Sequence, residues 1–135
     1  MTKFLFQMDD PKDFNIEEDS TYLMIKEAVS RGVKCFYNDP KWIYVDLNNK
    51  KKIKSKVFEI FVKKNNQISY ASKKSKVIDL EVFDAVFIRQ DPPFNLQYIS
   101  NTYLLDHLKN PLVINNPKEI RNYPEKHIMM NFPKL

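Results

Sequence analysis

Arg89 and Asp91 are the charged residues of this 135-residue chain whose positions point most directly to chemistry. They follow an apolar run, residues 85–88 (Ala-Val-Phe-Ile), and they precede Pro92 and Pro93. Such a run predicts a buried strand of a parallel sheet. The two prolines cannot extend the strand, because neither has an N–H to give to a neighbour. Open α/β sheets bind ligands just beyond the carboxyl ends of their strands, so we predict a binding site here.

Arg89 keeps its charge at physiological pH and needs an anionic partner at the edge of a sheet. That partner is a carboxylate or phosphate of a ligand, or else a neighbouring acidic side chain. The residues alone leave both possibilities open.

Other residue types exclude several kinds of site. The single glycine, Gly32, excludes Walker A and GxGxxG phosphate loops, so the domain does not bind a nucleotide on its own. His107 and His127 have no partners at a metal-ligand spacing. The one cysteine, Cys35, lies in an apolar stretch, which predicts an inert core thiol and fits a reducing cytosol.

The net charge of +5 is distributed unevenly. Residues 50–76 contain ten lysines and one acid, Glu59, so this segment carries +9 and the remainder −4. Because these cations are all lysine and confined to one segment, we expect a solvated lysine-rich arm rather than a specific nucleic-acid site. No run of 18 apolar residues occurs, so we expect no membrane span.

The apolar pattern predicts one α/β domain with a mostly parallel sheet flanked by helices. We expect the first strand to be central and two or three antiparallel, lysine-rich strands to protrude from the sheet. The predicted strands are residues 3–8, 33–37, 42–46, 54–63, 67–72, 85–88 and 112–114. Helices are predicted over 20–31, 95–109 and from 117 to before Pro124, with a helical turn at 78–83 and another helix beginning within 125–130.

Helix ends are marked by their usual residues. Asp19 or Ser20 is placed to cap the first predicted helix, and Gly32 to close it in the left-handed C′ conformation. Asn95 and Asn116 are placed as the caps of the later two.

Segments spread in order over nearly the whole chain resemble the N-terminal part of bacterial glutathione synthetase. They are Met8–Pro11, Asp19–Thr21, Arg31–Gly32, Ile88–Phe94 with Tyr98 and Thr102–Leu104 after it, Asn115–Pro117, Ile120–Arg121 and Glu125–Lys126. The resemblance implies a Rossmann-like pre-ATP-grasp domain over residues 1–123. Residues 124–135 would begin the linker and ATP-grasp region, whose remainder this chain lacks.

The same resemblance implies the reaction of the intact enzyme. ATP phosphorylates the cysteinyl carboxylate of γ-glutamylcysteine, and the amine of glycine attacks the acyl phosphate to give glutathione, ADP and phosphate. The missing ATP-grasp domain would supply most of the catalytic groups and would hold ATP with Mg or Mn. A cytoplasmic homo-oligomer is expected, and the present chain alone is expected to bind no cofactor and to be inactive.

Five residues match positions with implied roles. Arg89 matches the substrate-binding arginine, and Asp91 is expected to hold the turn or orient Arg89 and to contact a substrate ammonium group. Ser20 and Thr21 are expected either to bind substrate or only to cap a helix. Lys126 matches a lysine that contacts ATP phosphate when the missing domain is present.

Two alternatives remain at this point. The chain could be a non-catalytic module that binds a polyanion through the Lys50–Lys76 arm. Alternatively, the ligase architecture could act on another substrate, because Gln90 and Asn95 replace the lysine and aspartate that are commoner in the resembled family.

Overall fold

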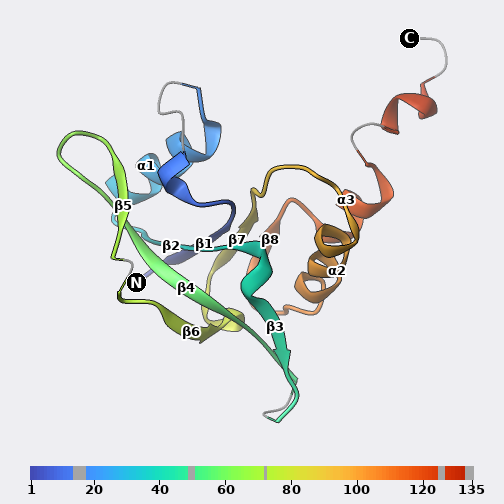
Figure 1. Ribbon diagram of the computed structural model, residues 1–135, viewed down its shortest axis with the longest axis horizontal. Coiled ribbons are helices and arrows are strands. Elements are labelled where there is room, and N and C mark those ends of the chain that lie inside the picture. The colour runs from blue at the N-terminus through green and yellow to red at the C-terminus, as the bar shows by residue number, and fades with distance from the viewer. Residues whose placement is uncertain (14–17, 49–50, 72, 125–126, 133–135) are drawn as a thin grey trace.

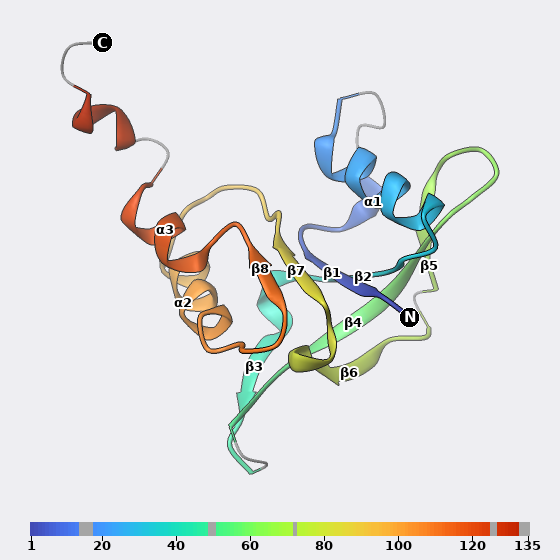
Figure 2. The same cartoon turned by 180° about the vertical axis from the view of Figure 1, so that it is seen from behind.

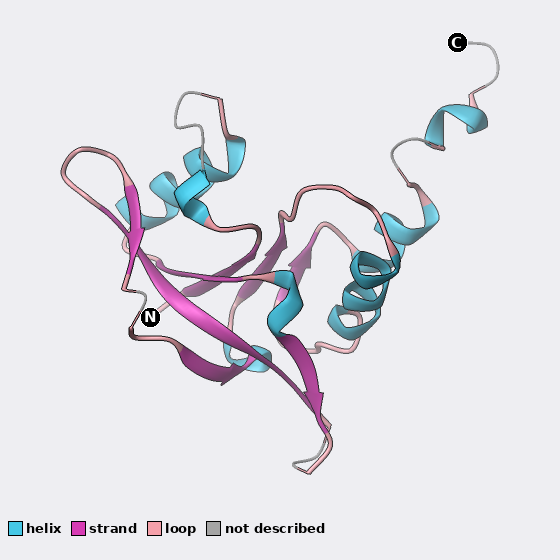
Figure 3. Ribbon diagram, in the orientation of Figure 1, coloured by secondary structure: helices cyan, strands magenta, loops and turns pink. Residues whose placement is uncertain are grey.

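The computed structural model describes residues 1–13, 18–48, 51–71, 73–124 and 127–132 (Figures 1 and 3). Its strands are β1 (Lys3–Gln7), β2 (Lys34–Asn38), β3 (Ile43–Asp46), β4 (Lys52–Val62), β5 (Ile68–Tyr70), β6 (Lys76–Asp79), β7 (Ala85–Ile88) and β8 (Leu112–Ile114). Its α-helices are α1 (Ser20–Ser30), α2 (Leu96–Leu105) and α3 (Pro117–Asn122), and 3₁₀ turns occupy Pro11–Asp13, Pro40–Trp42, Leu80–Val82 and Ile128–Asn131.

Four parallel strands form the central part of the sheet, in the order β2-β1-β7-β8. β1 is the first strand of the chain and lies between β2 and β7, with Phe4 opposite both Cys35 and Ala85. The predicted α/β class and the central position of the first strand are therefore confirmed.

The lysine-rich segment continues this sheet. β4 pairs antiparallel with β2, and β3, β5 and β6 in turn pair with β4. The two ends of β4 extend well past the parallel strands (Figure 2). The helical turn predicted at 78–83 is wrong for its first two residues, because Ile78 and Asp79 belong to β6 and pair with Ser55 and Lys54. It is confirmed for Leu80–Val82, which forms a 3₁₀ turn.

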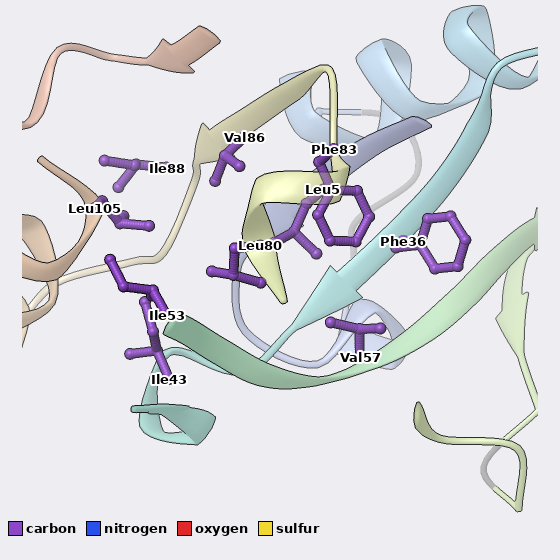
Figure 4. Close-up of a cluster of buried hydrophobic side chains, with 10 residues drawn as sticks. All are labelled: Leu5, Phe36, Ile43, Ile53, Val57, Leu80, Phe83, Val86, Ile88 and Leu105. Atoms are coloured by element: carbon purple, nitrogen blue, oxygen red, sulfur yellow. The ribbon is translucent and has the colours of Figure 1, made fainter. Parts of the chain in front are cut away.

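Two hydrophobic clusters cover opposite faces of the sheet, as alternation along the strands requires. On one face Leu5 and Val86 pack with Leu105 of α2 (Figure 4). On the other face Phe6 and Tyr37 pack with Ile25 of α1. The helix after β1 and the helix after β7 therefore lie on opposite faces.

The predicted caps form in the structure. Asp19 accepts hydrogen bonds from two backbone N–H groups of α1, Asn95 and Asn116 cap α2 and α3, and Gly32 has φ +77°. The second helix ends at Leu105 rather than near 109.

The strand predicted over residues 112–114 forms as β8, which lies at the edge of the sheet and pairs with β7 alone. Leu112 is therefore 65% exposed, although it belongs to an apolar run.

Cys35 lies in β2 with no exposed surface, and burial raises the pKa of its thiol to about 11. The folded chain therefore holds the thiol proton more tightly than the unfolded chain, whose cysteine pKa is about 8.5. We predict that iodoacetamide at pH 8 modifies the native chain at least about a hundredfold more slowly than the urea-unfolded chain. Mass spectrometry measures the modification rates of the two states. Equal rates would show that β2 opens readily in the native chain.

Candidate functional site

The carboxyl ends of β1, β7 and β8 and the amino end of α1 surround a cavity of about 450 Å³. The chain passes to one face of the sheet after β1 and to the other after β7, so the two connections separate and leave a crevice between them. This is the topological switch point at which open α/β sheets bind ligands. Arg89, where the sequence predicts a binding site, lines this cavity.

Arg89 enters the cavity from the end of β7. Its backbone N–H donates to the carbonyl oxygen of Gln7 at 2.8 Å, which fixes the start of its side chain. Its Nε donates to Oγ1 of Thr21 at 2.9 Å, and its Nη2 donates to Oγ of Ser20 at 2.8 Å. The side chain is therefore held between two strands and the first turn of α1.

Both side-chain partners of this guanidinium are neutral. Among the described residues no carboxylate lies within 4 Å of its nitrogens, so no salt bridge to a neighbouring acid occurs there. Ser20 and Thr21 use two of its five N–H groups. The arrangement favours the ligand anion over the local acid as the partner of Arg89.

Ser20 and Thr21 were expected to bind substrate or to cap a helix. The cap is Asp19, whose Oδ1 accepts from the N–H groups of Thr21 and Tyr22 at 2.7 and 3.1 Å. The hydroxyl groups of Ser20 and Thr21 are thereby available to position Arg89.

Asp91 lies at the mouth of the cavity and is exposed. Its backbone N–H donates to Oδ2 of Asp9 at 2.9 Å, which ties the turn after β7 to the turn after β1. Within the described residues its carboxylate makes no hydrogen bond to Arg89. The expected orienting role therefore falls to Ser20 and Thr21, and Asp91 holds the turn through its backbone.

Tyr98 of α2 closes another side of the cavity. Burial raises the pKa of its hydroxyl, Arg89 opposes the rise and Asp91 adds to it. The phenol therefore stays neutral beside two charged groups.

The β4–β5 hairpin supports the acidic wall of the cavity, and the sequence did not indicate this role. The Tyr70 hydroxyl donates to Oδ2 of Asp10 at 2.8 Å. On α1, the Tyr22 hydroxyl donates to the carbonyl oxygen of Asn66 at 2.6 Å. The lysine-rich segment is thus tied to both the loop after β1 and the helix that holds Arg89.

Two separate hydrogen bonds from buried amide side chains lie beneath the cavity, and the sequence did not indicate them. Gln7 is 1% exposed, and its Nε2 donates to Oε1 of Gln90 at 2.8 Å. Beside it in β2, Asn38 donates to Oγ of Ser55 at 3.1 Å. Gln90, which replaces the lysine that is commoner in the family, therefore has Gln7 as its hydrogen-bond partner. The sequence signal that could have indicated this contact is the polar residue Gln7 within the apolar strand β1.

Several sequence predictions have other outcomes. Lys126 lies outside the described residues. Two lysines of the basic arm are paired, Lys52 with Asp79 at 2.9 Å and Lys54 with Asp46 at 2.7 Å. The described residues contain no cluster of three or more His, Cys, Asp or Glu side chains that could hold a metal ion, and no helix long and apolar enough to cross a membrane.

A double-mutant cycle tests whether Thr21 acts through Arg89. Thr21→Val keeps the side-chain shape but leaves Nε without its acceptor, so the free energy of unfolding in urea should fall by about 1 kcal/mol. The same change in an Arg89→Met background should cost almost nothing. Thr2→Val, at an exposed position, is the matched control. Equal costs in both backgrounds would show that Thr21 stabilises α1 independently of Arg89.

Comparison with known proteins gives a consistent result. Residues 2–121 match the family described as prokaryotic glutathione synthetase, N-terminal domain. Proteins named glutathione synthetase from Rhodopseudomonas palustris and Wigglesworthia glossinidia brevipalpis are 34% and 31% identical to the chain over 134 residues, which is 98% of this chain and 42% of each relative. The glutathione synthetase of Vibrio parahaemolyticus is 34% identical over 137 residues, covering 100% of this chain and 42% of the relative.

The chain therefore spans about two fifths of the length of these relatives. The matched region contains both halves of the cavity, from the loop after β1 to the turn after β7. From these matches we conclude that the chain belongs to the family of prokaryotic glutathione synthetase N-terminal domains.

Proposed function

We propose that this chain is the substrate-binding domain of a glutathione synthetase. The intact ligase would join γ-glutamylcysteine and glycine with ATP, through an acyl phosphate, and release glutathione, ADP and phosphate. The observation that carries the proposal is an arginine held by two neutral hydroxyl groups in a cavity at the switch point, within a region that matches the family.

The charges of the cavity indicate a division of labour. Carboxylates line its walls and would repel the phosphates of ATP, so we place ATP, with Mg or Mn, in the rest of the ligase. The single glycine, Gly32, closes α1 and so cradles no phosphate. We assign residues 1–123 to the substrate domain and residues 124–135 to the start of an ATP-grasp region, where Lys126 would contact ATP phosphate.

Arg89 would bind a carboxylate of the dipeptide. Its remaining N–H groups form part of a planar fork that matches a carboxylate with two parallel hydrogen bonds. Ser20 and Thr21 would act as positioning residues, since they touch the guanidinium rather than the reacting atoms. A fixed arginine loses little conformational entropy when it binds, which increases the affinity.

A cytoplasmic location and a homo-oligomeric assembly complete the proposal, since both are implied by the resemblance to bacterial glutathione synthetase. The polyanion module is the less favoured alternative, because the arm uses Lys52 and Lys54 in ion pairs and uses its hairpin to support α1.

The proposal can be tested with a fused protein, in which this chain is followed by the part of the Vibrio parahaemolyticus relative that lies beyond the matched region. The fused protein should release ADP only when γ-glutamylcysteine and glycine are both present, and this chain alone should release none. A folded fusion that does not respond to the dipeptide would contradict the assignment.

Arg89→Lys in the fused protein should lower kcat/KM for γ-glutamylcysteine about ten- to a hundredfold. Lysine keeps the charge but loses the fork, and a charge-assisted hydrogen bond contributes about 1.5–3 kcal/mol. The melting temperature should fall by only a few degrees, because lysine also loses the hydrogen bond from Nε to Thr21, which contributes about 1 kcal/mol. Arg31→Lys is the matched control, because Arg31 is exposed and pairs with Glu27 at 2.7 Å on the surface of α1. A lowered melting temperature with unchanged kinetics would remove Arg89 from the site.

A further inference from the structure

A second cavity, of about 700 Å³, lies between the β3–β4 hairpin and the end of α2. Its apolar lining consists of Val45, Leu47 and Ile53 from the hairpin and Leu104 from α2. We call this cavity the β3–β4 groove. It shares no lining residue with the cavity that contains Arg89, so it is a separate surface of the molecule.

The β3–β4 groove lies at the opposite edge of the parallel sheet from the cavity that contains Arg89. Its lining residues Glu81 and Lys109 come before β7 and β8, whereas Arg89 and Asn115 follow these two strands and line the other cavity. The far ends of β3 and β4 accordingly point away from α3 (Figures 1 and 2). In the proposed ligase the remaining domain would follow α3 and meet the substrate at the other cavity, which leaves this groove uncovered.

The apolar face of the hairpin continues beyond the part that α2 covers. Ile43 and Ile53 are buried in the cluster that contains Leu105 of α2. Val45, two residues along the same face of β3, is 37% exposed, and Leu47 just beyond the strand is 73% exposed. Apolar residues that extend from a core into an exposed groove are typical of a protein–protein contact.

β3 is also an unprotected edge strand. In the part of the chain that the structure describes, it pairs with β4 alone. Its residues, Ile-Tyr-Val-Asp, include no lysine or proline, which commonly protect such an edge. Its one charged residue, Asp46, is already paired with Lys54 at 2.7 Å. The strand therefore offers both apolar side chains and a row of backbone groups to a second chain.

The charges of the groove favour a second copy of this chain over an acidic partner. Three lysines and two acids line it, namely Lys51, Lys52, Lys109, Asp79 and Glu81, and Lys52 pairs with Asp79 at 2.9 Å. Because these charges nearly balance, two copies can approach each other with little net repulsion, and a strongly acidic partner would gain little. A twofold contact also buries the same exposed residues of both copies at once.

We propose that the β3–β4 groove is the interface between two copies of this chain, with Val45 and Leu47 of each copy buried by the other. The inference rests on the proposed function, because it assigns a surface to the proposed homo-oligomer and places the rest of the ligase at the other cavity. Since the groove and that cavity lie at opposite edges of the sheet, the Arg89 cavity of each copy stays open to its substrate.

Sedimentation equilibrium of this 135-residue chain tests the interface. At the concentrations used for NMR the chain should sediment with twice the mass of one copy. Leu47→Lys should weaken the dimer at least about a hundredfold, because it would bury two unpaired charges in each dimer. The circular dichroism spectrum and melting temperature of the variant monomer should be unchanged, since Leu47 is exposed. Leu23→Lys is the matched control, because Leu23 is 56% exposed on α1 and does not line the groove, and it should leave the dimer intact.

A nitroxide label locates the contact. Asn48→Cys carries the label next to Leu47, and the native Cys35 is not labelled because it has no exposed surface. When a labelled copy is mixed with an isotope-enriched copy that has no nitroxide, the amide signals of Leu104 and Lys109 in the enriched copy should broaden. The same label at Lys26→Cys, an exposed position on α1, is the control and should not broaden them.

Three results would overturn the inference. They are a chain that stays monomeric at these concentrations, a dimer that Leu47→Lys does not weaken, and a dimer in which the label at position 48 leaves the groove signals sharp. None of them decides the proposed function, because the release of ADP by the fused protein tests that function separately.

Discussion

The parallel pairing of β1 with β7 is the constraint on which the candidate site depends. It places Gln7 opposite Ile88 and lets the N–H of Arg89 bond to the carbonyl of Gln7. Two loops separated by some 80 residues in sequence therefore leave the sheet side by side, and Asp9 can accept from the backbone of Asp91. A shift of one residue in this register would turn every β7 side chain to the other face and remove Arg89 from α1.

The lysine-rich segment has a structural role that its high positive charge did not indicate. β4 runs antiparallel to β2 and carries three further strands, so it widens the sheet on the side of α1. Through Tyr22 and Tyr70 the hairpin holds the helix that fixes Arg89 and the loop that carries Asp10. Lysines facing solvent on such strands keep a long, exposed sheet soluble and discourage pairing with other chains. The segment therefore supports the site from a distance.

Features that depend on residues close together in the sequence were predicted correctly. The apolar run before Pro92 predicted the strand and its end, and Asn95, Asn116 and Gly32 predicted the helix ends. Contacts between distant segments have no such pattern: nothing near Thr21 in sequence indicates that its hydroxyl accepts from Arg89, and nothing near Tyr70 indicates Asp10. The β6 strand was missed for the same reason, because its pairing with β4 outweighs the helical tendency of the residues that follow.

The neutral partners of Arg89 bear on how such a domain can be selective. An arginine already paired with a carboxylate would have to exchange one anion for another, and most of the interaction energy would cancel. Hydroxyl groups fix the direction of the guanidinium, and in the part of the chain that the structure describes no carboxylate pairs with it at contact distance. Carboxylates that line the same cavity would then repel ligands that bring no cation. Selection by charge pattern therefore requires both features together: a positioned arginine without an acidic partner, and acids nearby that do not touch it.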